Sequence, residues 1–355
     1  MDFEGRAVTP LVSVIIPCRN EVQSIERCLD SVLASDYPPQ RLEVIVADGM
    51  SRDGTRDRVD RHAARDPRVR RIDNPARTTP HGLNRAIAAA QGELILRLDA
   101  HARIAPDYIA KAVQALEAWG ADCVGGAMRT VAAGSGAFAE PIRIALGQRF
   151  GVGNAHFRTG SNKPLFVDTV FGPCWRRDVI ARIGWFDERL ERSQDIEFSG
   201  RLRRAGGKIL MSPEMKIDYY ARATLGGFWR QNWSNGVWAI LPFAHVSGIA
   251  VRWRHLAPLA LVLGLAGSAV AAAWTGMWLA WIVTGSYAAA NVAASVQAAW
   301  KERSPGVAFR LPVVFASLHL AYGLGSLWGC IRLAVLLTKP LFTKQKSRPL
   351  PEVMG

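Results

Sequence analysis

The sequence predicts an α/β domain with an open, mostly parallel sheet, followed by transmembrane helices. Two observations support this prediction. Over the first 120 residues, short apolar runs alternate with segments of helical spacing on short connections, which is typical of an open parallel sheet. Residues 256–300 contain no Asp, Glu, Lys or Arg. This gap of 45 residues is more than twice the roughly 20 that one membrane-crossing helix needs.

The elements of the α/β domain follow in order along the chain. Short apolar runs predict strands at residues 11–16, 42–47, 69–72 and 93–98. Apolar residues at helical spacing, or runs of alanine, predict helices at residues 22–33, 52–64, 82–90 and 107–119. Asn20, with Gln23 three residues later, predicts the start of the first helix, and Pro106 that of the last. Glycine-rich connections between residues 120 and 218 predict a looser part of the same domain.

The positive charge points to a membrane rather than to nucleic acid. Of the net charge of +14, the residues after Asp218 contribute +10, from twelve basic residues and two acids. Basic clusters flank the apolar segments, at Arg252, Arg254 and His255 and at Lys301, Arg303 and Arg310. Such clusters favour the cytoplasmic face. We therefore expect a multi-pass protein of the cell inner (plasma) membrane, with a cytoplasmic first domain and no nucleic-acid partner.

The expected organisation has four parts. They are a cytoplasmic domain (1–225), an interfacial Trp-rich amphipathic segment (226–255), transmembrane segments within 256–338 (256–274, 277–297 and 311–331) and a basic tail (339–355). Thr275 and Gly276 join the first two crossings into a tight hairpin. The third segment leaves two interpretations open. A full crossing would place the basic tail outside, against the positive-inside rule, whereas Gly323 and Gly325 at its centre would suit a re-entrant segment.

The cysteines and the N-terminus agree with a cytosolic catalytic part. No basic-then-apolar leader precedes the first strand, so we expect no signal peptide. The five cysteines show no CxxC pair and no zinc-ligand spacing, which predicts reduced and mostly buried thiols at Cys18, Cys28, Cys123, Cys174 and Cys330.

Two acids stand where an open α/β sheet binds its ligands. Asp48 and Asp99 each follow a predicted strand directly, and the ligand crevice of such a sheet lies at the carboxyl ends of its strands. Four motifs in order strengthen this prediction, at residues 14–21 (VIIPCRNE), 46–55 (VADGMSRDGT), 98–101 (LDAH) and 193–198 (SQDIEF). Over roughly residues 10–240 the chain resembles family 2 glycosyltransferases of the succinoglycan-biosynthesis type.

The resemblance implies a GT-A-like sheet, the nucleotide-diphospho-sugar transferase fold, and an inverting transfer. The implied donor is a nucleotide-diphosphate sugar, with a UDP-sugar favoured, and the implied acceptor is a lipid-linked saccharide of exopolysaccharide or cell-surface glycan synthesis. The residues matching the family's donor pocket are Pro17, Asn20, Glu21, Asp48 and Asp99. An ordinary Asp-Gly turn is the alternative for Asp48. Helix capping suits Asn20 whether or not it also contacts the donor.

The resemblance also implies a divalent metal. Mg²⁺ and Mn²⁺ prefer carboxylate oxygen and would offset the charge that builds on the diphosphate leaving group. The family's Asp-x-Asp reads Asp99-Ala100-His101 here. Asp99 is therefore the predicted ligand, and His101 either ligates the metal or contacts the phosphates. The structural alternative is a strand-end Asp that caps the next helix.

The transfer needs a base that takes the proton of the attacking hydroxyl. Residues 193–198 match the family's acidic motif, which makes Asp195 the candidate. In the alternative, Asp195 and Glu197 only favour the first turn of a helix. The predicted acceptor side is Gly172, Arg176, Gln194 and Trp233. Arg77, His81 and Asn84 match a phosphate-near loop of the family or a solvated loop.

Two further functions are weighed against single-sugar transfer. A processive polysaccharide synthase of this family carries Gln-x-x-Arg-Trp near the membrane, whereas residues 231–235 read QNWSN. A catalytically silent membrane scaffold would need none of Asp48, Asp99 and Asp195. The sequence therefore favours addition of a single sugar.

Overall fold

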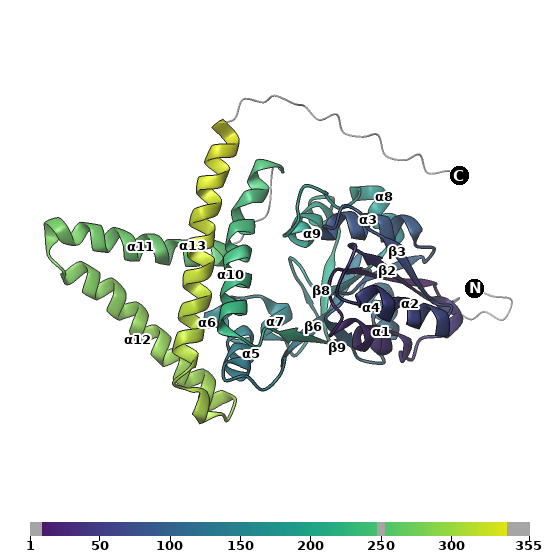
Figure 1. The fold of residues 1–355 in the computed structure, drawn as a ribbon, viewed down its shortest axis with the longest axis horizontal. Coiled ribbons are helices and arrows are strands. Elements are labelled where there is room, and N and C mark those ends of the chain that lie inside the picture. Colours follow the sequence, from purple (N-terminus) through teal and green to yellow (C-terminus); the bar gives the residue numbers. More distant parts are fainter. Residues whose placement is uncertain (1–8, 247–252, 339–355) are drawn as a thin grey trace.

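The computed structural model describes residues 9–246 and 253–338. Figure 1 shows an α/β domain with long helices attached along one side, so the predicted fold class is confirmed. The strands of these residues are β1 (Val12–Cys18), β2 (Leu42–Asp48), β3 (Val69–Asp73), β4 (Leu94–Arg97), β5 (Ala102–Ile104), β6 (Cys123–Ala132), β7 (Leu165–Phe166), β8 (Phe171–Arg176) and β9 (Ile209–Ala221).

All of these strands belong to one mixed sheet, in the order β3-β2-β1-β4-β8-β6-β9-β5, with β7 paired to β9. The four strands from β3 to β4 are parallel, and Cys18 at the end of β1 lies opposite Asp48 at the end of β2. Beyond β4 the sheet changes direction, because β8 runs antiparallel to both β4 and β6, while β9 is parallel to β6. The predicted parallel arrangement therefore holds for the first half of the sheet.

Helical connections join the parallel strands. They are α1 (Ile25–Leu33), η1 (Pro39–Arg41), α2 (Thr55–Arg65), α3 (Thr79–Ala89) and, after β5, α4 (Tyr108–Ala118). Their apolar faces cover strands whose central residues are fully buried, as at Ile15 and Ile45. Helix α1 begins three residues later than predicted, and Ser24 precedes it. Asn20 therefore does not cap this helix; its backbone has a positive φ of 55°.

The looser region after residue 120 completes the same sheet. It adds five helices, α5 (Ala139–Gly147), α6 (Arg149–Val152), α7 (His156–Thr159), α8 (Arg177–Ile183) and α9 (Gln194–Arg204). Residues after the sheet form α10 (Leu225–Ile240), η2 (Leu241–Ala244), α11 (Trp253–Thr275), α12 (Trp278–Lys301), η3 (Pro305–Val307) and α13 (Leu311–Thr338).

Among the described residues, α11, α12 and α13 are long and apolar enough to cross a membrane. Helices α11 and α12 form a hairpin that turns at Gly276, where φ is 78°, and extends away from the α/β domain (Figure 1). Helix α10 runs beside α13 on the flank of that domain (Figure 1).

Glycine does not break α13, which is continuous over 28 residues. Instead, its glycines admit neighbouring backbones. A Cβ at Gly323 would lie 2.2 Å from the carbonyl oxygen of Pro258 in α11, and one at Gly325 would lie 2.2 Å from that of Trp233 in α10. The predicted glycine break is therefore absent, and the central glycines are packing positions where helices meet closely.

Candidate active site

One cavity of about 1300 Å³ lies at the carboxyl ends of the parallel strands. Its lining includes Pro17 at the end of β1, Gly49 after β2 and Asp99 after β4. Parallel strands bring their ends to one edge of the sheet, so this position follows from the topology. Asp195, from the motif after residue 190, lines the same cavity. The fold thus joins all four sequence motifs around one space.

Glu21, Asp99 and His101 form a polar cluster at the sheet end of the cavity. Nδ1 of His101 lies 3.2 Å from Oε1 of Glu21, and Arg97 donates a hydrogen bond of 2.8 Å to Asp99. Burial alone would raise the pKa of Glu21, but hydrogen bonds from His101 and Ser24 hold it below its usual value. Burial alone would lower the pKa of His101, whereas Glu21 and the charge of Asp99 raise it.

The cluster fits a cation that protein and substrate hold together. Within residues 9–246 and 253–338, no three His, Cys, Asp or Glu side chains gather as a metal site. Mg²⁺, however, is usually bound through one or two protein ligands, with substrate phosphates and waters completing its shell. Asp99 and His101 both line the cavity and could supply two such ligands. Their donor chemistry suits Mn²⁺ or Mg²⁺ when a diphosphate is present.

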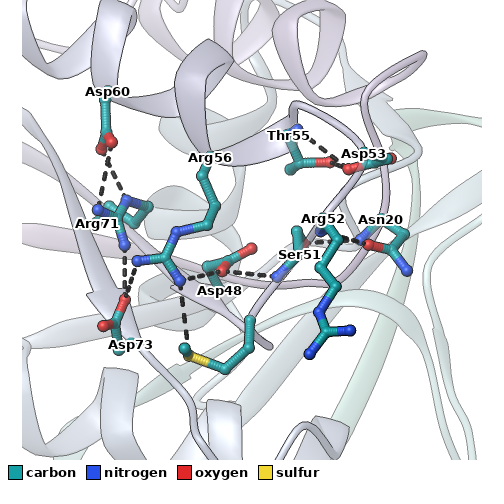
Figure 2. A network of polar contacts seen from close by, with 11 residues as sticks. Asn20, Asp48, Ser51, Arg52, Asp53, Thr55, Arg56, Asp60, Arg71 and Asp73 are labelled. Carbon is teal, nitrogen blue, oxygen red and sulfur yellow. Dashed lines mark hydrogen bonds and ion pairs between the residues drawn. The ribbon is translucent and has the colours of Figure 1, made fainter.

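Asn20 and Asp48 belong to a network beside the cavity rather than to its wall (Figure 2). Oδ1 of Asn20 accepts a hydrogen bond of 3.0 Å from the backbone of Arg52. Asp48 is fully buried; its Oδ2 atom accepts hydrogen bonds from the backbone of Ser51 (3.0 Å) and from Arg56 (3.3 Å). These contacts fasten the loop after β1 to the loop after β2. Oδ1 of Asp48 has no hydrogen-bond partner among the described residues.

Asp195 and Glu197 differ although they share the first turn of α9. Asp195 lines the cavity, half-buried, and its carboxylate makes no hydrogen bond or ion pair to any residue that the structure describes. Glu197 is 3% exposed and pairs with Arg201 at 2.6 and 2.9 Å. Gln194 is buried at the cavity wall with its Oε1 atom unpartnered in the described chain. Of these two acids, only Asp195 lines the cavity, where a substrate could reach it.

The loop that leads into α9 is held by α10. Ser193, with a φ of 61°, donates a hydrogen bond of 2.9 Å from its Oγ atom to the carbonyl of Trp238. Arg192 contacts the side chain of Asn235 at 3.3 Å. Because α10 packs along α13, the position of Asp195 depends on the helices that follow the sheet.

The sequence prediction missed an aromatic and basic wall of the cavity. Tyr219 in β9 stands edge-on to His101, with ring centroids 5.4 Å apart, and the guanidinium of Arg158 lies 5.3 Å from the Tyr219 centroid. Nη1 of Arg158 is buried without a hydrogen-bond partner in the described chain, and burial lowers the pKa of this group. Arg222, directly after β9, also lines the cavity. The strand-end reasoning used for Asp99 could have found Arg222.

Three of the four predicted acceptor-side residues do not line the cavity; Gln194 does. Gly172 has a φ of 59°, and its carbonyl accepts a hydrogen bond from the hydroxyl of Tyr108 at 2.7 Å, so it packs against α4. Arg176 pairs with Leu94 at the start of β4, the opposite end of the sheet from Asp99. Trp233 packs its backbone on Gly325 of α13.

The three residues of the predicted phosphate-near loop have different surroundings in the structure. Arg77 lines the cavity. Asn84 instead exchanges hydrogen bonds of 2.9 and 3.0 Å with the backbone of Phe186, and His81 pairs with Glu188 at 3.1 Å. His81 and Asn84 therefore fasten α3 to the segment before α9.

Comparisons with known proteins agree with this geometry. Residues 13–178 match the model of glycosyl transferase family 2. The succinoglycan biosynthesis protein ExoA of Rhizobium meliloti (strain 1021) is 31% identical over 314 residues, which are 88% of this chain and 92% of that protein. A Methanococcus voltae relative, named as a dolichyl N-acetyl-alpha-D-glucosaminyl phosphate 3-beta-D-2,3-diacetamido-2,3-dideoxy-beta-D-glucuronosyltransferase, is 24% identical over 63% of this chain and 71% of its own length.

A solved structure shares the fold. The mannosyltransferase PcManGT of Pyrobaculum calidifontis, in complex with GDP-Man and Mn²⁺, aligns over 91% of this chain and 88% of its own, with a TM-score of 0.58 and 22% identity. The extent of the match to the Rhizobium protein, which includes the helices after the sheet, decides the classification. This chain belongs to glycosyl transferase family 2 and is a glycosyltransferase.

Proposed function

We propose that this enzyme transfers one sugar, with inversion, from a nucleotide-diphosphate sugar to a lipid-linked saccharide in exopolysaccharide or cell-surface glycan synthesis. One observation carries the proposal: Asp99 and Asp195 line a single cavity that continues to the apolar helices α11 and α13. Its volume of about 1300 Å³ exceeds the roughly 300–1,000 Å³ of a typical small-molecule site. It therefore has room for a donor and part of an acceptor together.

The sheet end of the cavity suits the donor. Pro17 and Glu21 form its edge, and Arg77 adds a positive charge. A divalent cation held by Asp99 and His101 would offset the negative charge of the diphosphate leaving group. The named complex of PcManGT with GDP-Man and Mn²⁺ supports a donor and metal of this class. A UDP-sugar is the first donor to test. Asp48 lies behind the cavity wall, so it is assigned to the base or ribose through the loop after β2 that it holds.

Asp195 is the proposed base. In a single displacement the acceptor hydroxyl attacks the sugar from the face opposite the leaving group, and a base takes the hydroxyl proton. An unpaired carboxylate at the cavity wall can do this, whereas Glu197 is already committed to Arg201. Gln194 beside it has a free Oε1 atom that can accept a hydrogen bond from the acceptor.

The helices support a lipid-linked acceptor met at the cytoplasmic face of the inner membrane. Arg254 at the start of α11 pairs with Asp168 at 3.0 Å, and Glu302 after α12 pairs with Arg143 of α5 at 2.6 Å. Both basic ends of the hairpin are thus fastened to the catalytic domain. Trp274 near the turn is 79% exposed and Trp300 at the opposite end 85%, as in aromatic belts at two interfaces. The name of the Methanococcus relative includes a dolichyl phosphate-linked sugar.

A panel of nucleotide-diphosphate sugars tests the proposal on membranes that contain the purified enzyme. Release of the nucleoside diphosphate should require one donor, a divalent cation and a lipid-linked saccharide together. Nuclear magnetic resonance of the product should show an anomeric configuration opposite to that of the donor. Retention of configuration, or addition of many sugars to one acceptor, would contradict the proposal.

A further inference from the structure

Part of the cavity lining comes from the long helices, which the transfer chemistry alone does not require. This part, here called the second arm, includes Pro258 and Leu261 of α11 and Leu318 and Tyr322 of α13. These helices carry large exposed apolar side chains on their outer surfaces. The arm thus connects the reaction centre with the part of the molecule that faces hydrocarbon.

The charge of the lining indicates more than one anionic ligand group. Nine arginines line the whole cavity, against Glu21, Asp99, Glu191 and Asp195. Metal and arginines at the sheet end are sufficient for one diphosphate. The arginines that lie on α6, α10 and α11, Arg149, Arg230 and Arg254, exceed that need.

Arg149 is a cavity-lining arginine on a helix that contacts α13 directly. It begins α6, which packs on α13: the ring of Phe150 is 5.1 Å from that of Phe315, and the carbonyl of Phe150 lies 2.8 Å from Nε2 of His319. Gly153, at the end of α6, would bring a Cβ within 3.1 Å of Arg254. Arg254 already pairs with Asp168.

The side chain of Arg149 lines the cavity and makes no hydrogen bond or ion pair to any residue within 9–246 or 253–338. Its guanidinium therefore keeps five N–H donors for a ligand. Such a fork binds a phosphate or a carboxylate bidentately, and the proposed acceptor supplies a phosphate.

In the second arm, a basic side chain lies beside apolar side chains. A lipid phosphate has the matching arrangement, because its anionic group is followed directly by hydrocarbon. We infer that the second arm binds the phosphate and the first hydrocarbon units of the acceptor lipid. Arg149 holds the phosphate, Leu261 and Leu318 contact the chain, and the saccharide points towards Asp195. This inference rests on the proposed function and names the residues that recognise its acceptor.

Three acceptors that carry the same saccharide separate the contribution of the phosphate contact from that of the hydrocarbon contact. One has a long polyprenyl chain on its phosphate, one has a short water-soluble chain on its phosphate, and one is a glycoside without phosphate. Transfer is measured with the full-length enzyme in nanodiscs at saturating donor. The glycoside reports on folding and on the chemical step, because it needs neither contact.

Leu261→Trp fills the apolar arm, and Leu263→Trp is its control on the same helix, where Leu263 is 51% exposed and does not line the cavity. We expect Leu261→Trp to raise KM for the long-chain acceptor about tenfold, the effect of roughly 1.4 kcal/mol, and to leave the short-chain acceptor unchanged. Leu263→Trp should change neither. Equal effects of the two variants would overturn the assignment of the arm.

Arg149→Gln removes the phosphate contact, and Arg332→Gln is its control, because Arg332 is an exposed residue of α13 outside the cavity. We expect Arg149→Gln to raise KM about tenfold for both phosphate acceptors and not for the glycoside, since it removes the charge-assisted hydrogen bonds to the phosphate. An equal rise with Arg332→Gln would mean that only general attraction to an anionic surface is involved, which overturns the inference. If the wild-type enzyme used only the glycoside, the proposed function itself would be wrong.

Discussion

Oε1 of Glu21, in the loop after β1, lies 3.2 Å from Nδ1 of His101, in the loop after β4. The two residues are 80 positions apart in the sequence and belong to different motifs. Strands β1 and β4 are parallel neighbours, so their carboxyl ends lie side by side. The contact therefore shows that one edge of the sheet assembles the proposed metal and diphosphate site.

Asp99→Ala is expected to abolish metal-dependent donor binding, because it removes the carboxylate at this edge. His101→Ala should weaken binding less, or change the preference between Mn²⁺ and Mg²⁺, because imidazole suits Mn²⁺ better than Mg²⁺. Isothermal titration calorimetry of the donor with each metal measures both effects. Donor binding by Asp99→Ala that equals wild type with and without metal would refute this assignment.

Asp195→Asn is expected to lower turnover by roughly 10²–10⁴-fold, the usual contribution of a general base, with donor affinity within a few-fold of wild type. Because Asp195 has no partner in the described chain, the Tm of Asp195→Asn should equal that of wild type. Glu197→Gln is the matched structural control. It weakens a buried pair with Arg201, and losing one partner of such a pair costs about 3–5 kcal/mol, so Tm should fall. Turnover above about a tenth of wild type in Asp195→Asn would assign the base elsewhere.

Gly236→Ala is expected to destabilise the packing of α10 on α13. The added Cβ would lie 2.0 Å from the carbonyl oxygen of Tyr322, and overpacking of this kind costs about 1–3 kcal/mol. Gly226→Ala is the control, because a Cβ there meets nothing within 4 Å and alanine favours a helix by roughly 0.5–1 kcal/mol. Thermal unfolding in detergent should give a lower Tm for the first variant and an equal or higher Tm for the second. Equal shifts would mean that the two helices do not pack closely.

Helix α13 is expected to stay beside the catalytic domain over its whole length, so that a reporter placed after Thr338 is cytoplasmic. Its partner α10 is bonded to the catalytic domain, where Gln231 donates a hydrogen bond of 2.9 Å to the hydroxyl of Tyr219. A helix that packs along α10 remains beside that domain. A reporter inserted at Gly276, in the hairpin turn, should lie on the opposite side of the membrane. Labelling of cysteine reporters with a membrane-impermeant thiol reagent tests both positions, and two external reporters would show that α13 crosses.

Local sequence patterns determined much of this protein. Apolar runs and helical spacing identified β1 to β4 and α1 to α4 but not the three-residue strand β5, because burial of one face depends on residues that are close in the sequence. Strand ends are equally local, so Asp99 could be placed at the ligand edge before any pairing was known. The charge-free hairpin likewise followed from composition, since hydrocarbon excludes charged side chains.

Only the tertiary structure decided what several of these residues contact. Arg176 and Asp99 both adjoin strands, yet the antiparallel pairing of β8 with β4 places them at opposite ends of the sheet. Gly325 has the same conformational freedom whether it breaks a helix or packs one, and the close approach of Trp233 determines that it packs α10. Asn20 could cap a helix by its chemistry, but Arg52 binds its side chain instead. Each outcome depends on a partner distant in the chain, and a local pattern contains no information about which distant segment will arrive there.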